Sequence, residues 1–313
     1  MLAYIAKRLL ATIPVMAVVA VFVFALLRLT PGDPAAIIAG SAATSQDVAN
    51  IRLKLGLDEP IVTQFFVWLG NMARGDFGES FFFKRTVASL VGDRVEPTLM
   101  LSLTTIVLSV LIAVPLGVVA AYRQGTWIDR IVMGFSVLGF SVPVFVVAYG
   151  LILTLSVELD WLPVQGYRNF RDGVWQWFRH LILPSIALGT VYVALIARMM
   201  RASMLDVLAQ DYIRTAAAKG LARDQVLIGH ALKNAAIPVM TIIGMGIALL
   251  ISGAIVTETV FALPGVGRLT VDAILRRDYP VIQGVILMFS AVYVLVNLAV
   301  DLSYMFFDPR IRY

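Results

Sequence analysis

Six long apolar runs dominate this sequence, and each is close to the length that a helix needs to cross a bilayer. A hydrocarbon core about 30 Å thick requires about 20 consecutive apolar residues in an α-helix. Because hydrocarbon offers backbone N–H and C=O groups no partners, runs of this length favour membrane-spanning helices. The sequence therefore predicts an all-α polytopic membrane protein with six transmembrane helices. The runs are residues 9–27, 98–121, 131–157, 181–197, 235–256 and 282–306.

The composition agrees with a membrane protein and excludes several kinds of chemistry. Hydrophobic residues make up 60% of the 313 residues and charged residues 14%, whereas about a quarter of a soluble domain is charged. The chain has no cysteine and only two histidines, which excludes thiolate chemistry and argues against a histidine-rich metal site. It also lacks the G-x-x-x-x-G-K-[ST] phosphate-binding loop. We expect no cofactor on this chain, so ATP and Mg²⁺ would have to bind to another subunit.

The first run could instead be a secretory signal peptide. Its apolar stretch is longer than the roughly 7–15 residues of a signal peptide. Arg28 and the segment Pro31-Gly32-Asp33-Pro34 follow it, in place of a small-x-small cleavage site. We therefore expect a retained first transmembrane helix.

The segment between the first two runs is polar and predicts a small excursion with two helices. Thr44 and Asp47 have capping-box spacing ahead of a helix over 48–55, and Gly56 can end it. The pattern predicts a second helix over 60–72. Its expected apolar face consists of Phe65, Phe66, Trp68 and Leu69.

Basic residues set the expected orientation. Six helices place both termini on one side, and cytoplasmic termini put the excess of Lys and Arg inside, as in most inner-membrane proteins. Within the third run, Pro143 follows Ser136, Gly139 and Ser141 and marks the expected kink.

The polar loop, residues 199–234, interrupts the apolar sequence on the expected cytoplasmic side. It predicts one helix from Met204 to Lys219, an end at Gly220 with positive φ, and a second helix from about Arg223 to Asn234. A hairpin that only connects two spans is the alternative. A helical loop on this face favours contact with a soluble partner.

Residues 214–220 (RTAAAKG), followed by His230-Ala231-Leu232, resemble the EAA loop of binding-protein-dependent ABC importer permeases. Residues 211–216, 218–221 and 230–238 are similar to the dipeptide/oligopeptide branch of that family. The resemblance covers essentially the whole chain. Further matching segments are residues 31–34, 75–80, 161–163, 258–268 and 308–310.

The resemblance implies a type I ABC importer permease fold with a cytoplasmic coupling helix that docks on an ATPase. Arg214 stands where the general family has glutamate, so the acidic contact of the general family is not carried over. Lys233 stands where the general pattern has proline, and both departures suit the peptide branch. The implied docking residues are Asp211, Tyr212, Arg214, Thr215, Ala216, Ala217, Lys219 and Gly220.

The resemblance also implies the partners and the location. These are a second homologous permease subunit, two ATP-binding cassette subunits that carry ATP and Mg²⁺, and an extracytoplasmic substrate-binding protein. The expected surroundings are the lipid of the cytoplasmic (inner) membrane, and no nucleic acid is expected. Short peptides are the leading cargo, while glutathione and nickel chelates stay open.

Four residues are candidates for the pathway or an outer gate: Glu258, Phe261, Pro264 and Asp301. Charges at the ends of spans commonly pair locally, so Glu258 could instead pair with an interfacial arginine. Asp301 could likewise form a structural ion pair near the cytoplasmic end of the last run.

Two other classes of membrane protein are alternatives. An ion-coupled secondary transporter usually carries several intramembrane ionisable groups and internal repeats, and only Asp301 qualifies here. An intramembrane enzyme would need paired catalytic groups within the spans. The expected domains are 1–30 (first transmembrane helix), 31–96 (periplasmic excursion), 97–306 (five-helix core, with the polar loop and a periplasmic loop at 257–281) and 307–313 (cytoplasmic tail).

Overall fold

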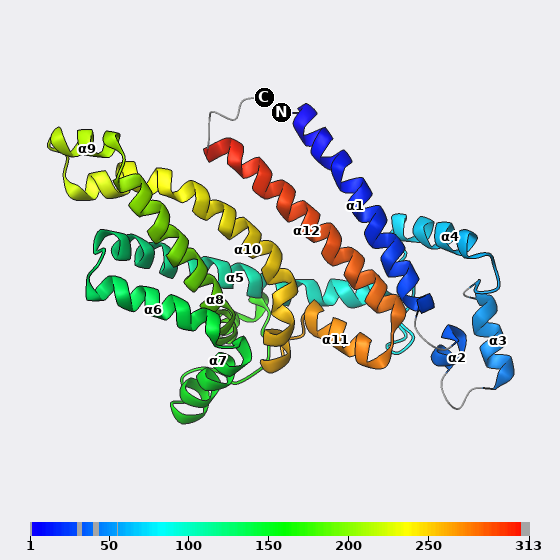
Figure 1. Ribbon diagram of the computed structural model, residues 1–313. Helices are drawn as coiled ribbons and strands as arrows, with labels where there is room; N and C mark the ends of the chain where they lie inside the picture. The colour runs from blue at the N-terminus through cyan, green and yellow to red at the C-terminus, as the bar shows by residue number, and fades with distance from the viewer. Residues whose placement is uncertain (1, 30–32, 40–43, 55, 308–313) are drawn as a thin grey trace. The chain divides into compact units, whose positions relative to one another are not determined.

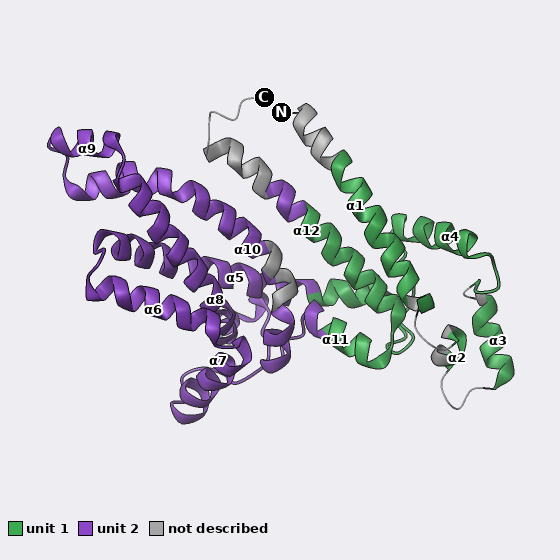
Figure 2. Ribbon diagram, viewed as in Figure 1, with its two compact units in different colours: residues 1–94, 269–294, 313 green, residues 95–268, 295–312 purple. Residues whose placement is uncertain are grey.

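The computed structural model describes residues 2–29, 33–39, 44–54 and 56–307, although several side chains within them, including those of 2–9 and 300–307, are not described. These residues form helices and loops, with one isolated antiparallel bridge between Glu79 and Thr86. The chain divides into two compact units (Figure 2). Unit 1 comprises residues 1–94 and 269–294, and unit 2 comprises 95–268 and 295–312.

Figure 1 shows the helices in chain order. Unit 1 holds α1 (Leu2–Leu29), α2 (Pro34–Ala39), α3 (Ser45–Lys54), α4 (Ile61–Ala73), the start of α5 (Val87–Tyr122), most of α11 (Val266–Arg276) and the first half of α12 (Tyr279–Phe307). Unit 2 holds the rest of α5, α6 (Trp127–Ser141), α7 (Val144–Leu151), the π-helix η1 (Ile152–Glu158), the 3₁₀ turn η2 (Phe170–Asp172), α8 (Val174–Leu208), α9 (Asp211–Ala218), the π-helix η3 (Gln225–Leu232) and α10 (Lys233–Val260).

The described residues contain four helices that are long and apolar enough to cross a bilayer, or five spans if α6 and the α7–η1 helix are counted as one bent span. The four lie within α5, α8, η3–α10 and α12. Residues 10–26 of α1 form a shorter apolar helix, and α1 as a whole has 28 residues. The chain is thus an all-helical polytopic membrane protein.

The predicted kink at Pro143 is confirmed. The helices before and after it meet at 105°. Val142 has extended backbone angles and Pro143 precedes the first residue of α7. Proline lacks the N–H that would continue α6, and its ring restricts the preceding residue to extended conformations, so the helix ends there.

Helix α8 is the centre of unit 2 and packs against α6, α7 and α10. Its buried face is rich in small residues, which allow close backbone approach between membrane helices. These include Ala187, Ala194 and Ala197. With 35 residues, α8 is much longer than the apolar run 181–197, because its polar ends continue the helix beyond the apolar stretch.

The two helices expected in the excursion are present in unit 1. Thr44 and Asp47 form the reciprocal hydrogen bonds of a capping box before α3, and Gly56 has φ +62°. The predicted apolar face of α4 was wrong in one residue. Phe65, Trp68 and Leu69 pack inside unit 1, whereas Phe66 is 64% exposed, because it lies about 100° around the helix from each adjacent residue.

A buried ion pair joins α6 to α8. Asp129 is 4% exposed, and its carboxylate accepts hydrogen bonds from Arg201 Nε at 2.5 Å and Nη2 at 2.7 Å. It also accepts one from the backbone N–H of Gly125 at 3.0 Å. Such two-point geometry fixes both side chains.

We expect Asp129→Ala to lower the free energy of unfolding by about 1–3 kcal/mol, because it leaves the partly buried Arg201 guanidinium without its carboxylate. Replacing both residues, as Asp129→Ala with Arg201→Met, should recover much of that loss. Thermal unfolding in detergent, followed by tryptophan fluorescence, measures the cycle. If the losses of Asp129→Ala and Arg201→Met simply add in the double variant, the two residues are not coupled.

Candidate functional site: the polar loop and the outer loop

The polar loop is built from the end of α8, the short helix α9, η3 and the start of α10. The prediction of one helix from Met204 to Lys219 was wrong, because α8 ends at Leu208 and α9 starts at Asp211. Gln210 between them is extended, with ψ 148°. The 8-residue α9 is therefore a separate helix with its own direction (Figure 1).

The expected end of the first loop helix is confirmed. Gly220 has φ +83°, and its N–H donates to the carbonyl of Ala217 at 3.0 Å. A side chain at this φ is strained because Cβ approaches the backbone, which glycine avoids. The second helix starts at Arg223 as expected, but it continues through η3 into α10 without ending at Asn234.

Apolar packing and a hydrogen bond hold α9 against the rest of unit 2. Ile213 is 5% exposed and belongs to the unit's hydrophobic core, and Ala216 packs against that core. Asn234 Nδ2 donates to the hydroxyl of Tyr212 at 2.9 Å, which ties α9 to the first turn of α10. One face of α9 is thus anchored.

The remaining predicted docking residues are exposed together. Asp211 and Arg214 have side chains that are 96% and 74% exposed, with a loose contact of 3.5 Å between them. An exposed pair of this kind contributes little to stability, so its charges are available to a partner. Thr215, Ala217, Lys219 and Gly220 are exposed as well.

At the other end of α10, the chain reverses in a Schellman motif. The N–H of Leu263 donates to the carbonyl of Glu258 at 2.8 Å, and that of Ala262 donates to Thr259 at 3.3 Å. Ala262 takes the left-handed conformation, with φ +51°. These bonds satisfy carbonyls that the helix end leaves free.

The carboxylate of Glu258 is fully buried and lies at the start of α11. Oε1 accepts from the Thr98 hydroxyl at 2.6 Å and Oε2 from the backbone N–H of Arg268 at 2.8 Å. Val266 N–H donates to the Thr98 oxygen at 2.9 Å. A carboxylate is stabilised at a helix N-terminus by the unpaired N–H groups and the helix dipole.

Close packing requires a glycine at position 265, beside this carboxylate. A Cβ on Gly265 would lie 2.1 Å from Cδ of Glu258 and about as close to both oxygens. The loop that follows Glu258 therefore packs closely around its buried carboxylate. Thr98 and Gly265 were not predicted as site residues. The sequence pattern that could have indicated Gly265 is an acid followed by P-G-V-G-R before an amphipathic stretch.

The other outer candidates fall in different environments. Phe261 is 1% exposed, and its carbonyl accepts from the N–H of Gly166 at 2.9 Å. Pro264 is exposed. The side chain of Asp301 and residues 308–313 lie outside the described part of the chain.

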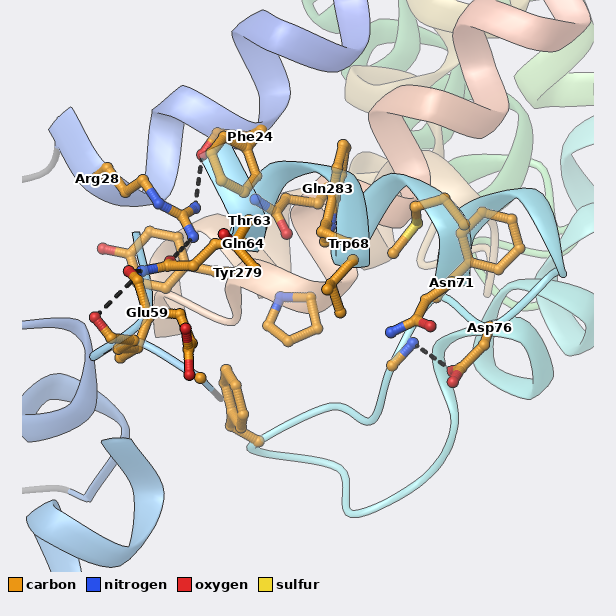
Figure 3. Close-up of a pocket in the computed structure, with 18 of the residues that line it drawn as sticks. Phe24, Arg28, Glu59, Thr63, Gln64, Trp68, Asn71, Asp76, Tyr279 and Gln283 are labelled. Carbon is orange, nitrogen blue, oxygen red and sulfur yellow. Dashed lines mark hydrogen bonds between the residues drawn. The ribbon is translucent and has the colours of Figure 1, made fainter. Parts of the chain in front are cut away.

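Unit 1 contains a separate cavity of about 400 Å³ (Figure 3). Its wall includes the end of α1, one side of α4 and the first turn of α12. Arg28 donates hydrogen bonds to the carbonyl of Phe24 and to the side chain of Gln64. Its guanidinium group is therefore hydrogen-bonded to other residues of the wall. Groups of three or more potential metal ligands are not found among the described residues.

Comparison with known proteins defines the class to which this chain belongs. The family "binding-protein-dependent transport system inner membrane component" matches residues 113–313, and the N-terminal family of the same membrane components matches residues 1–104. The chain belongs to this family of inner-membrane, multi-pass transport subunits and is a permease component rather than an enzyme.

Individual relatives agree over the full length. The chain is 54% identical over 310 residues to a "Probable peptide ABC transporter permease protein" of Sinorhizobium fredii, covering 99% of each chain. It is 45% identical over 313 residues to a glutathione transport system permease of Escherichia coli K12, covering 100% of each.

A solved structure supports the fold. The MetNI methionine ABC transporter in an inward facing conformation matches with TM-score 0.56 and 16% identity, over 70% of this chain and 96% of that one. At this identity the match shows an ABC importer permease-like fold and nothing about cargo.

Gly265→Ala should destabilise the outer loop, because its methyl group would overlap the Glu258 carboxylate. We expect a loss of about 1–3 kcal/mol, typical of overpacking. Gly150→Ala is the matched control, since a Cβ there meets nothing within 4 Å. Thermal unfolding of the two variants measures the difference, and equal midpoints would contradict the packing described.

Proposed function

We propose that this chain is the permease subunit of an ABC importer that moves short peptides across the cytoplasmic membrane. The full-length relatives carry the proposal, above all the 54% identical protein described as a peptide transporter permease. The exposed, anchored helix α9 supports it, since a coupling helix must offer a face to a partner.

The proposed assembly contains a second homologous permease, two ATP-binding cassette subunits and an extracytoplasmic binding protein. In it, this chain has six transmembrane helices, with α1 as the first, and both termini in the cytoplasm. The domain division is the one expected from the sequence. The 257–281 loop, with Glu258, Phe261 and Pro264, faces the outside, and with Asp301 it stays a candidate for the pathway or gate.

In the proposed mechanism, α9 fits a groove of the ATPase subunit and transmits its ATP-driven closure. Asp211, Arg214, Thr215, Ala217 and Lys219 supply the exposed face. Ala216 and Ile213 fix the opposite face to unit 2, while Gly220 sets the turn beyond the helix.

Glutathione is the second candidate cargo, because the Escherichia coli relative at 45% identity is a glutathione system permease. Mass spectrometry of the ligand that co-purifies with the partner binding protein separates the two. A mixture of short peptides supports the first candidate and glutathione alone supports the second.

Gly220→Val should abolish transport while the protein still inserts into the membrane. The side chain meets open space, so the cost is backbone strain of roughly 1–2 kcal/mol at positive φ, which reshapes the turn next to α9. Lys219→Ala should do much less, because an exposed charge in the last turn contributes only about 0.3–1 kcal/mol.

Gly75→Val is the matched control, with φ +81° and open space but outside the polar loop. Uptake of labelled peptide and ATPase activity in the assembled transporter are the measurements. The proposal fails if Gly220→Val transports normally, or if Gly75→Val is equally impaired.

The orientation predicts that a cysteine introduced at exposed Ser45 is labelled from outside. The chain has no cysteine of its own, so an impermeant maleimide reports this position alone. Cells with a permeable outer barrier should show labelling before lysis of the inner membrane. Labelling that appears only after lysis would reverse the topology.

A further inference from the structure

Helix α4 has one apolar face that nothing in unit 1 covers. It has 13 residues and carries no charged side chain. Val62 and Phe66 are each 64% exposed, and at about 100° per residue they lie in one arc of about 80° with Gly70 and Ala73. A helix whose apolar surface extends beyond its packed side needs cover there as well.

The packed side of α4 shows at which depth the helix lies. Trp68, Leu69 and Met72 pack against Ala20 and Val23 of α1 and against Leu287 of α12. At 1.5 Å per residue, these contacts lie about 6–10 Å inside the ends of the apolar runs of α1 and α12. Leu287 also falls within the candidate span Tyr279–Ala299.

Helix α1 also exposes apolar residues in this stretch. Val18, Val21 and Phe22 of α1 are 55–69% exposed in the same stretch as its contacts with α4. A membrane-spanning helix presents such residues to acyl chains. With lipid around α1 at this depth, the free arc of α4 meets lipid too.

The remaining side of α4 carries three polar residues, with Val67, which is 59% exposed, between them. Thr63, Gln64 and Asn71 lie on one side of the helix and line the cavity (Figure 3). Gln64 also donates to the carbonyls of Leu57 and Glu59. Interfacial helices enter the bilayer with their apolar face by about 5–10 Å and keep polar groups toward water, and the depth of α4 against α1 and α12 fits that position.

We propose that α4 is an interfacial membrane helix, with Val62 and Phe66 in contact with lipid acyl chains and with Thr63, Gln64 and Asn71 toward the aqueous side. Part of the segment expected to be a soluble excursion is therefore seated in the membrane. In the topology proposed above, this is the outer leaflet.

Single cysteines test the proposal in the complete transporter. Phe66→Cys, Thr63→Cys and Phe22→Cys are labelled with monobromobimane in detergent and reconstituted in vesicles with and without nitroxide-labelled acyl chains. The Phe66→Cys and Phe22→Cys labels should be quenched at least twofold more by the lipid nitroxide than the Thr63→Cys label. Iodide in the buffer should quench Thr63→Cys most.

Two results would overturn the proposal. Quenching of Phe66→Cys by iodide to the extent seen at Thr63→Cys would place the face in water. Protection from both quenchers would mean that a protein subunit covers it. The lipid quenching does not depend on orientation or cargo, so its failure is distinct from failure of the proposed function.

Discussion

Away from water, a helix can end or break only where its freed backbone groups find partners within the protein, and the helix ends of unit 2 follow from this constraint. The break between α6 and α7 falls at Pro143, where one N–H is missing in any case. Helix α10 ends in a Schellman motif that returns two N–H groups to its last turn. Helix α11 begins where a carboxylate is ready to accept its first N–H groups.

The burial of Glu258 is understandable on the same basis. Burying an isolated carboxylate in an apolar interior costs free energy. The Glu258 carboxylate accepts hydrogen bonds from the Thr98 hydroxyl and from the backbone at a helix N-terminus, which offset that cost. Its backbone carbonyl accepts the N–H of Leu263. One residue thus fixes the end of α10 and the start of α11. A gating role for Glu258 would require these bonds to break or the whole loop to move with them.

Local features of this chain were predictable from its sequence because they depend on neighbouring residues. The capping box at Thr44, the kink at Pro143 and the positive φ of Gly220 each arise from a few adjacent side chains. The outward direction of Phe66 was missed because an apolar run without polar breaks does not show which face packs. The start of α11 was missed because its capping carboxylate comes from a different helix, and Thr98 is 160 residues from Glu258.

The contacts of the polar loop bear on how force at α9 would reach the rest of unit 2. Toward α8 the chain passes through the extended Gln210, whose carbonyl accepts the N–H groups of Ile213 and Arg214 in the first turn of α9. Toward α10, the Tyr212–Asn234 hydrogen bond adds a second connection, and the buried Ile213 packs in the core of unit 2. In the proposed mechanism, the ATPase subunit acts on α9. Because α8 packs along α10 and is joined to α6 by Arg201 and Asp129, we expect a push on α9 to move these three helices as a group.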